Sequence, residues 1–323
     1  MPKVIVSMVT YNATGYLPFA LPSLAALDNK EGELIIIDNA STDQSSEYIK
    51  NAGYDCTLIE SPTNRGFGAG HNEVIRKTSS EYVLVFNQDM VIEPDYIKEC
   101  VSFMDAHPEV GSVTGILQRA RWDKQGNLEK TESIDTCGIR IKKSHNAKDI
   151  TQVVSWEKPF EIFGPSGACA LYRRSALEDV AYREGDSIEY FDEDFFMYKE
   201  DIDLAYRLRW QGWRSYALPT ARAYHFRTKG QKFVRNNKQV NYWSYRNHIY
   251  LIIKNVSKGM LPSCLPTMTA YEIAKIGYIL LREWSTLRGL KDVWRLRNRM
   301  TKKRVSIMRT RRMSDTEMLS LLQ

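Results

Sequence analysis

The amino-acid sequence predicts an α/β fold built on a mostly parallel sheet. Short apolar runs alternate with segments of helical spacing through the first third of the chain, which is typical of a parallel sheet flanked by helices. Polar side chains directly follow three of the apolar runs, at the strand ends where such sheets bind ligands. The length of 323 residues, with 43% hydrophobic and 26% charged side chains, suits two structural units or one large unit with an appendage.

We expect four strands in the first third, where apolar and often β-branched residues occur together, with helices between them. The strands should cover residues 3–9, 33–37, 56–60 and 82–86. The helices should cover residues 17–27, 45–52 and 70–77. Thr10–Asn12, Asp38–Asn39 and Asn87–Asp89 each follow a strand, so these side chains should meet at one edge of the sheet.

The rest of the chain is less regular. Residues 119–149 are polar and weakly periodic, which favours a long loop or a hairpin that covers the site. Residues 163–172 predict a turn that feeds a strand, and residues 215–225 predict a last strand that ends at His225. Beyond about Thr228 the alternation stops, and three helices are expected at residues 240–255, 267–284 and 286–300. Pro262 and Pro266 should mark the gap between the first two of these helices.

A segment that mixes acids with aromatic residues leads into a helix expected at residues 201–210 and ended by Gly212. Because aromatic side chains favour burial and carboxylates do not, the segment is typical of a cleft wall with its acids pointing inward. Its acids are Asp192, Glu193, Asp194, Glu200, Asp201 and Asp203. The helix dipole favours negative charge at the first turn, so we expect Asp201 to be ionised at neutral pH. An acidic cap on a surface helix is the alternative interpretation.

Positive charge is concentrated near the end of the chain. Residues 282–312 contain twelve Lys and Arg against two acids, a local net charge of +10 in a chain whose total is +6. Trp284 and Trp294 lie among these basic residues, a composition that suits a membrane surface. A solvated helix and an oligomer contact are the alternatives.

Cysteine usage and the lack of targeting segments bear on the compartment. Five scattered cysteines without a C-x-x-C pair favour a reducing environment. No apolar run resembles a signal peptide or reaches the length of a membrane span. We therefore expect a cytoplasmic protein whose basic helices contact the inner face of the cell membrane.

Several short motifs admit both a functional and a structural interpretation. Asp89 closes a buried strand and suits Mg²⁺ or Mn²⁺, although an Asp after a strand is more often a turn residue. Asp38 could accept a hydrogen bond from a nucleoside or simply cap its own loop. The glycine-rich run at residues 64–72 suits an anion and Arg65 suits a phosphate, while a solvated arginine is equally consistent. His225 ends a predicted strand, where a lone histidine usually has a structural role.

Some classes of protein are excluded. The sequence has no G-x-S-x-G, H-E-x-x-H or P-loop motif, which argues against serine hydrolases, zinc proteases and P-loop NTPases. The basic tail has no recognised RNA or DNA module beside it, so no nucleic-acid partner is expected.

In this order, the motifs resemble the inverting glycosyltransferases of family 2, which have the GT-A fold, and within them a rhamnosyltransferase-like branch. Six blocks carry the resemblance: Val9–Asn12, Ile37–Asp43, Asn64–Asn72, Phe86–Asp89, Gly167–Arg174 and Phe191–Leu204. It implies a GT-A nucleotide-sugar-binding and catalytic domain at residues 1–230. The remaining residues, 231–323, would form a helical C-terminal extension.

The resemblance also implies roles for individual residues. Asp201, with Glu200 beside it, matches the general base that deprotonates an acceptor hydroxyl. Asp89 matches the acid of the family's D-x-D motif, and His225 matches a histidine that completes the shell of a divalent metal, Mg²⁺ or Mn²⁺. The positions implied for the nucleotide sugar are Thr10, Tyr11, Asn12, Asp38, Asn39, Arg65, Gly70, Asn87 and Gln88. Asn87 replaces the first acid of the D-x-D motif, and Tyr11 would stack on the base.

The implied activity is transfer of a sugar, with inversion, from a nucleotide diphosphate donor to a hydroxyl of a growing, lipid-linked cell-surface glycan. The first donor expected is dTDP-L-rhamnose. The implied partners are this donor, a glycan or lipid-diphosphate-linked acceptor, a membrane surface and a second copy of the chain. A UDP-hexose-dependent transferase of the same fold, and a nucleotide-sugar-binding protein without turnover, are the alternatives.

Overall fold

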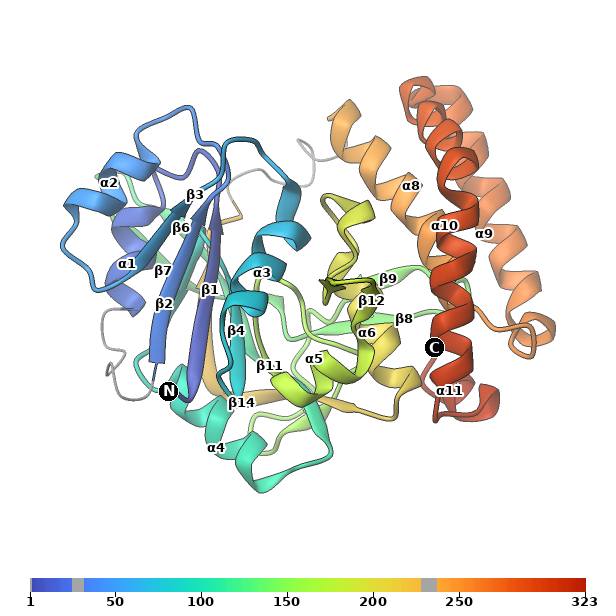
Figure 1. Cartoon of the computed structure of the whole chain (residues 1–323), viewed down its shortest axis with the longest axis horizontal. Helices are drawn as coiled ribbons and strands as arrows, with labels where there is room; N and C mark the ends of the chain where they lie inside the picture. Colours follow the sequence, from blue (N-terminus) through green and yellow to red (C-terminus); the bar gives the residue numbers. More distant parts are fainter. Residues whose placement is uncertain (1, 25–31, 228–236) are drawn as a thin grey trace.

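The computed structural model describes residues 2–24, 32–227 and 237–323, and its first third is the predicted succession of parallel strands and helices (Figure 1). The parallel strands are β1 (Val4–Thr10), β2 (Gly32–Asp38), β3 (Thr57–Glu60) and β4 (Tyr82–Asn87). The helices between them are α1 (Leu17–Leu24), α2 (Ser45–Asn51) and α3 (Gly66–Lys77). The seven predicted elements are therefore confirmed, with α3 starting one turn earlier than expected. The predicted end of the first helix, at residues 25–27, lies outside the described residues.

The other half of the sheet is mixed rather than parallel. Its strands are β5 (Met90–Ile92), β6 (Val110–Trp122), β7 (Leu128–Thr136), β10 (Phe160–Glu161), β11 (Cys169–Arg173) and β14 (Arg214–His225). The order across the sheet is β10-β14-β6-β11-β4-β1-β2-β3, with β5 beside β14 and β7 beside β6. Because β11 enters between β4 and β6 in the opposite direction, its first residues lie beside the end of β4.

The polar region at residues 119–149 contains hairpins, in agreement with one of the two predicted forms. The end of β6 pairs with β7, and β8 (Ile139–Ile141) pairs with β9 (Ala147–Asp149). Further along, β12 (Tyr182–Glu184) and β13 (Ser187–Glu189) form another hairpin. The helices of this part are α4 (Tyr96–Ala106), α5 (Arg174–Val180), η1 (Glu193–Phe195) and α6 (Glu200–Trp210).

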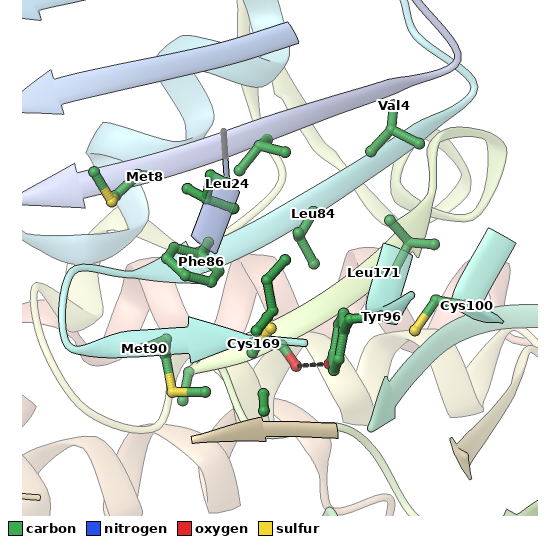
Figure 2. Packing of buried hydrophobic residues seen from close by; sticks show 14 of the residues in the cluster. Val4, Met8, Leu24, Leu84, Phe86, Met90, Tyr96, Cys100, Cys169 and Leu171 are labelled. Carbon is green, nitrogen blue, oxygen red and sulfur yellow. Dashed lines mark hydrogen bonds between the residues drawn. The ribbon is translucent and has the colours of Figure 1, made fainter. Parts of the chain in front are cut away.

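Both faces of the sheet are covered. Val4, Val6 and Met8 of β1 pack in one apolar cluster with residues of α1 and α4, while Ile5 packs on the opposite face against Val74 of α3. This is the period-two alternation of a buried strand. Within the first cluster the Tyr96 hydroxyl donates to the Cys169 carbonyl at 3.1 Å, which ties α4 to the start of β11 (Figure 2).

The last helices of the chain pack against α6 and its neighbours. They are α8 (Lys238–Asn255), α9 (Leu261–Arg282), η2 (Trp284–Leu287), α10 (Arg288–Thr310) and α11 (Asp315–Ser320). The expectation that Pro262 and Pro266 lie between helices is wrong, because both lie in the first turns of α9. Pro262 is tolerated because the first N–H groups of a helix have no partner within it, whereas Pro266 lies inside the helix and removes one hydrogen bond.

These helices share an apolar cluster with α6. Trp210 and Ile202 of α6 belong to the same buried cluster as Met300 and Ile307 of α10. None of the helices in the described part of the chain is long and apolar enough to span a membrane. The predicted boundary near residue 230 lies outside the described residues, so the division into two domains stays a prediction.

Candidate functional site

The end of β4 brings the two central carboxylates of the prediction to one edge of the sheet. The Asn87 N–H donates to the Ala168 carbonyl at 2.9 Å, just before β11 begins. The neighbouring Gly167 N–H donates to Asp201 Oδ2 at 2.9 Å, so the first turn of α6 lies against this edge. Asp89 follows Asn87 on the same strand end. Asp201 and Asp89 therefore lie at the same edge of the sheet, beside the same pair of strands.

Asp201 and Glu200 share the first turn of α6 but differ in environment. Asp201 is partly exposed, and its carboxylate accepts the N–H groups of Gly167 and Ile202, at 2.9 and 2.8 Å. Glu200 is buried, and its Oε2 has no hydrogen-bond partner among the described residues. Burial, together with the Asp201 charge, raises the pKa of Glu200 to about 8. Glu200 is therefore protonated at neutral pH, which leaves Asp201 as the accessible carboxylate.

The helix dipole is not the only influence on the charge of Asp201. Burial raises the pKa of Asp201, and the two backbone N–H donors only partly oppose that rise. A raised pKa is the usual adjustment of a carboxyl that serves as a base near neutral pH. Of the two carboxyl groups, Asp201 is the first to ionise, because it accepts two backbone N–H groups.

A second group surrounds His225 at the end of β14. Its Nε2 lies 3.3 Å from Asp89 Oδ2 and its Nδ1 lies 2.8 Å from Asp135 Oδ2. Burial alone would lower the pKa of His225, but the Asp89 and Asp135 carboxylates raise it to about 9. Arg119 and Arg227 also approach Asp135, at 3.5 and 2.9 Å. Asp135 was not predicted, since no motif in the polar segment at residues 119–149 distinguishes it.

This group fits a divalent metal held by few protein ligands. A carboxylate and an imidazole face each other, and Asp135 orients the second nitrogen of the imidazole, as carboxylates commonly do behind metal-bound histidines. No group of three or more His, Cys, Asp or Glu side chains suited to a metal occurs in the described ranges. Asp89 and His225 would therefore need oxygen ligands from a bound diphosphate to complete the shell.

The loops after β1 and β4 present a tyrosine. The Tyr11 N–H donates to Gln88 Oε1 at 2.7 Å, and Gln88 Nε2 donates back to the Tyr11 carbonyl at 3.2 Å. Gln88 therefore fixes the backbone of Tyr11, whose side chain is 43% exposed and available for stacking. Asn12 has a positive φ of 52° and accepts the N–H groups of Thr42 and Asp43, which joins the first and second loops.

Asp38 is a buried carboxylate that holds its own loop. It accepts the Ser41 N–H at 3.1 Å and the hydroxyl groups of Ser41 and Thr10. With 4% of its surface exposed, Asp38 fits the capped-loop interpretation of its motif. Its predicted contact with a nucleoside, and that of Thr10, stay predictions, because the described contacts of both side chains lie within the protein.

Three other residues predicted to contact the nucleotide sugar also have contacts within the protein, and their predicted roles stay predictions. The Asn39 amide donates to Asn64 Oδ1 and the Gly66 carbonyl, both at 3.1 Å, and accepts the Arg65 N–H. The Arg65 guanidinium is paired with Glu73, and its side chain is 38% exposed. At Gly70 a Cβ would lie 2.7 Å from a methyl group of Val9, so this glycine permits α3 to pack against β1. Packing therefore accounts for Gly70 in the glycine-rich run, although the run has the sequence pattern of an anion-binding loop.

The loop before α6 is held in an unusual conformation. Phe196, Tyr198 and Lys199 have positive φ values of 62°, 70° and 73°, which are unfavourable for side chains with a Cβ. The Phe67 N–H at the start of α3 donates to the Phe196 carbonyl at 2.9 Å. At Gly66 a Cβ would lie 2.2 Å from the same carbonyl oxygen, so only glycine fits. The loop therefore packs closely against the start of α3.

Two neighbouring residues of α8 hold this loop by its carbonyl groups. Asn247 is fully buried, and its amide nitrogen donates to the carbonyls of residues 195, 197 and 198, at 3.0, 2.8 and 2.7 Å. Arg246 donates to the carbonyls of residues 194 and 195, at 2.7 and 2.8 Å. The predictions did not include this contact, because it joins segments about fifty residues apart.

The expectation that the acids between Asp192 and Asp203 all point into a cleft is wrong. Asp192 and Asp203 are fully buried and both pair with Lys254 of α8. Lys303 of α10 also lies 2.6 Å from Asp192, and Arg207 lies 2.9 Å from Asp203. Burial alone would raise the pKa of Asp192, but Lys254 and Lys303 hold that pKa well below its usual range. These acids bind the C-terminal helices to the loop that precedes α6.

Comparisons with known proteins agree with this arrangement. Residues 5–181, more than half of the chain, match the model of the family described as Glycosyl transferase family 2. Poly-beta-1,6-N-acetyl-D-glucosamine synthase of Staphylococcus epidermidis is 29% identical over 205 residues, which cover 62% of this chain and 44% of that protein. The synthase of the same name from Staphylococcus aureus is 26% identical over 218 residues, 66% of this chain and 47% of the relative. The chain thus spans less than half the length of either relative.

Solved structures show the same fold at low sequence identity. The structure of GalNAc-T7 with UDP, GalNAc and Mn²⁺ superposes with a TM-score of 0.60 at 14% identity, over 79% of this chain and 48% of that one. Residues 1–349 of S. aureus TarS in complex with UDP-GlcNAc superpose with a TM-score of 0.56 at 16% identity, over 95% of this chain and 89% of that one. The predicted GT-A fold with a C-terminal helical extension is therefore confirmed.

Proposed function

The chain belongs to glycosyl transferase family 2, and from that premise we propose that it transfers a sugar from a nucleotide diphosphate donor to an acceptor hydroxyl with inversion. The observation that carries the proposal is the position of Asp201 beside the end of β4, at the same edge as Asp89 and His225. A direct displacement needs a base on one side of the sugar and charge compensation for the leaving diphosphate on the other.

In this mechanism Asp201 accepts the proton of the acceptor hydroxyl. Its partial exposure gives it access to the acceptor, and its raised pKa makes it a stronger base than an ordinary surface carboxylate. Glu200 keeps its proton, so the pair does not present two adjacent charges to the acceptor. Tyr11, in the loop after β1, offers an exposed ring on which a nucleobase could stack.

The diphosphate would lie near Asp89 and His225. A divalent metal bound there would neutralise negative charge on the departing diphosphate, with Asp89 and His225 as its protein ligands. Asp135 keeps the imidazole oriented, through its contact with His225 Nδ1 at 2.8 Å. Arg119 and Arg227, both about half exposed beside Asp135, add positive charge at this end of the site.

The proposal also ranks the nucleotide sugars that could serve as the donor. The relatives and the TarS complex described above are named for N-acetylglucosamine, which makes UDP-GlcNAc the first donor to test. dTDP-L-rhamnose, the donor expected from sequence, is the second. We propose a glycan, joined to a lipid diphosphate, as the acceptor class, because a polymer-building transferase needs an acceptor that can be extended.

A donor panel tests the proposal. The full chain is incubated with UDP-GlcNAc, UDP-hexoses, dTDP-L-rhamnose or GDP-mannose, with and without Mn²⁺, and nucleoside diphosphate release is measured. Release with one donor, stimulated by an acceptor glycan, supports a transferase. Tight binding of a donor without release under any condition would instead favour the non-catalytic alternative, for which Asn87 in place of an acid gives slight support.

A further inference from the structure

The outward face of the second half of α9 is apolar. Its exposed side chains include Ile273, Ile276 and Leu280, which follow the i, i+3, i+7 spacing of one helix face. Leu265 extends this face toward the start of the helix, and Leu281 widens it near the end. The exposed fractions of 54% at Leu265, 67% at Ile273 and 81% at Leu281 are too large for side chains that the protein itself covers.

No charged side chain interrupts this face. Between residues 261 and 281 the charged residues are Glu272 and Lys275, and both are turned toward the rest of the protein. Glu272 lies 2.7 Å from His248 of α8, and Lys275 lies 3.6 Å from Glu283 at the end of α9. A surface helix of a monomeric protein normally places its charged residues outward, so α9 has the reverse arrangement.

Tryptophan and basic residues follow the apolar face directly. Trp284 in η2 and Trp294 in α10 are 67% and 68% exposed. The guanidinium of Arg297 lies over the Trp294 ring at 4.5 Å. The exposed basic residues of α10 include Arg288, Lys291, Arg295, Arg297 and Lys302. Helices α9 and α10 both lie on the side of the molecule remote from α1 and α2 (Figure 1).

We propose that α9 lies in the headgroup layer of an anionic lipid bilayer, with its apolar face inserted and the basic residues of α10 beside lipid headgroups. An apolar helix face that is followed in the chain by exposed tryptophan and cationic side chains has the composition of an interfacial helix. A second copy of the chain is a less suitable partner for this face. A symmetric contact would bring together two C-terminal segments that each carry a net charge of +10 over residues 282–312.

The structure also changes which element makes the contact. The basic residues at 282–312 were expected to dock on the membrane as a group, but Lys303 and Arg299 are paired with acids of the catalytic half. Lys303 and Arg299 cannot bind lipid headgroups without breaking those ion pairs. The apolar residues of α9, which were not distinguished from a packing helix in the sequence, supply the insertion. This inference does not depend on the proposed transferase activity.

Vesicle flotation of the full chain tests the proposal. The chain should float with phosphatidylcholine vesicles that contain phosphatidylglycerol at least ~10-fold more strongly than with pure phosphatidylcholine, since each basic residue near an anionic surface adds to binding. The double variant Ile273→Asp, Leu280→Asp should lose at least ~10-fold of that binding, because two inserted side chains become charged. Val154→Asp is the matched control, since Val154 is 72% exposed on another part of the surface.

Two results would overturn the proposal. One is equal flotation with neutral and anionic vesicles, or none with either. The other is a dimer, seen by analytical ultracentrifugation of the wild-type chain, that the Ile273→Asp, Leu280→Asp variant converts to monomer, which would assign the face to a second copy. Because the altered side chains are exposed, the variants should unfold at the wild-type temperature, and circular dichroism checks this.

Discussion

Glu200 and Asp201 show how burial divides the work of two adjacent carboxyl groups. The buried Glu200 has no hydrogen-bond partner for one oxygen in the described part of the chain, and its pKa is raised to about 8. Asp201 has two backbone donors and partial access to solvent. The same helix turn thus supplies one neutral and one ionisable carboxyl, and only the second is placed to act as a base.

Asp201→Asn should reduce kcat at least ~100-fold, the usual effect of removing a general base. The amide has nearly the same shape, so the dissociation constant for the donor should stay close to that of the wild type. Nucleoside diphosphate release at saturating donor and acceptor measures kcat, with the exposed Asp186→Asn as control. Turnover near the wild-type rate would assign the base elsewhere, with Glu200 the next candidate.

Glu200→Gln should change how stability depends on pH. The pKa of Glu200 is about 8 in the folded chain against an ordinary value of 4.5, so the unfolded chain releases this proton first as the pH rises. The wild type therefore loses stability between those values, and the glutamine variant does not. We expect the Tm of the variant, relative to wild type, to be higher at about pH 9 than at about pH 5.

Thermal unfolding at both pH values checks this expectation, with Glu47→Gln, on the surface of α2, as the control. A difference in Tm between variant and wild type that is the same at both pH values would mean that Glu200 ionises at its ordinary pKa in the folded chain.

The loop of residues 194–199 is the element on which the geometry of the carboxylates depends. Three of its residues have positive φ without being glycine, a conformation that persists only where the surroundings hold it. Asn247 and Arg246 of α8 hold it by its carbonyl groups, and α3 holds it from the other side. The C-terminal helices therefore help to fix the position of the turn that contains Glu200 and Asp201.

Asn247→Asp should lower kcat at least ~10-fold with little change in the donor KM, because small displacements of a catalytic group are costly while the donor loops are untouched. The carboxylate has the shape of the amide but cannot donate to the three carbonyls. Steady-state kinetics with varied donor separates the two constants. Asn298→Asp, exposed on α10, is the matched control, and a normal kcat for Asn247→Asp would refute the positioning role.

Across the whole molecule, buried ion pairs join the α/β half to the C-terminal helices. Lys254 of α8 is fully buried between Asp192 and Asp203, and Lys303 of α10 reaches Asp192, Asp194 and Glu189. Together with the apolar cluster shared by α6 and α10, these pairs make the two halves depend on each other. Separation of the halves would leave buried carboxylates without partners.

Lys254→Met should lower the free energy of unfolding by about 3 kcal/mol, since removal of one partner leaves buried charge without compensation. Urea unfolding followed by circular dichroism measures the change. Lys258→Met makes the same substitution at an exposed lysine near the end of the same helix and should be nearly neutral. If the two variants unfold at the same urea concentration, the buried pairs do not hold the halves together.

The sequence correctly predicted the helices and strands that depend on residues close together in the chain. The strands and helices of the first third follow from apolar periodicity, and the end of the last strand at His225 follows from the same pattern. Strand β5 and the entry of β11 against the direction of its neighbours were not predicted, because strand pairing depends on residues far apart in the chain. Arg65 and Gly70 show the same limit, since their partners, Glu73 and Val9, become apparent only when the helix is packed.

By itself, the sequence determined the fold class and the positions of Asp89, Asp201 and His225 at element ends, because strand ends and helix starts are set by local composition. Only the tertiary structure decided which carboxylates face solvent and which are neutralised by lysines from distant helices. The reason is that the charge state of an acid depends on burial and on neighbours in space, and neither is encoded in the residues beside it in the chain.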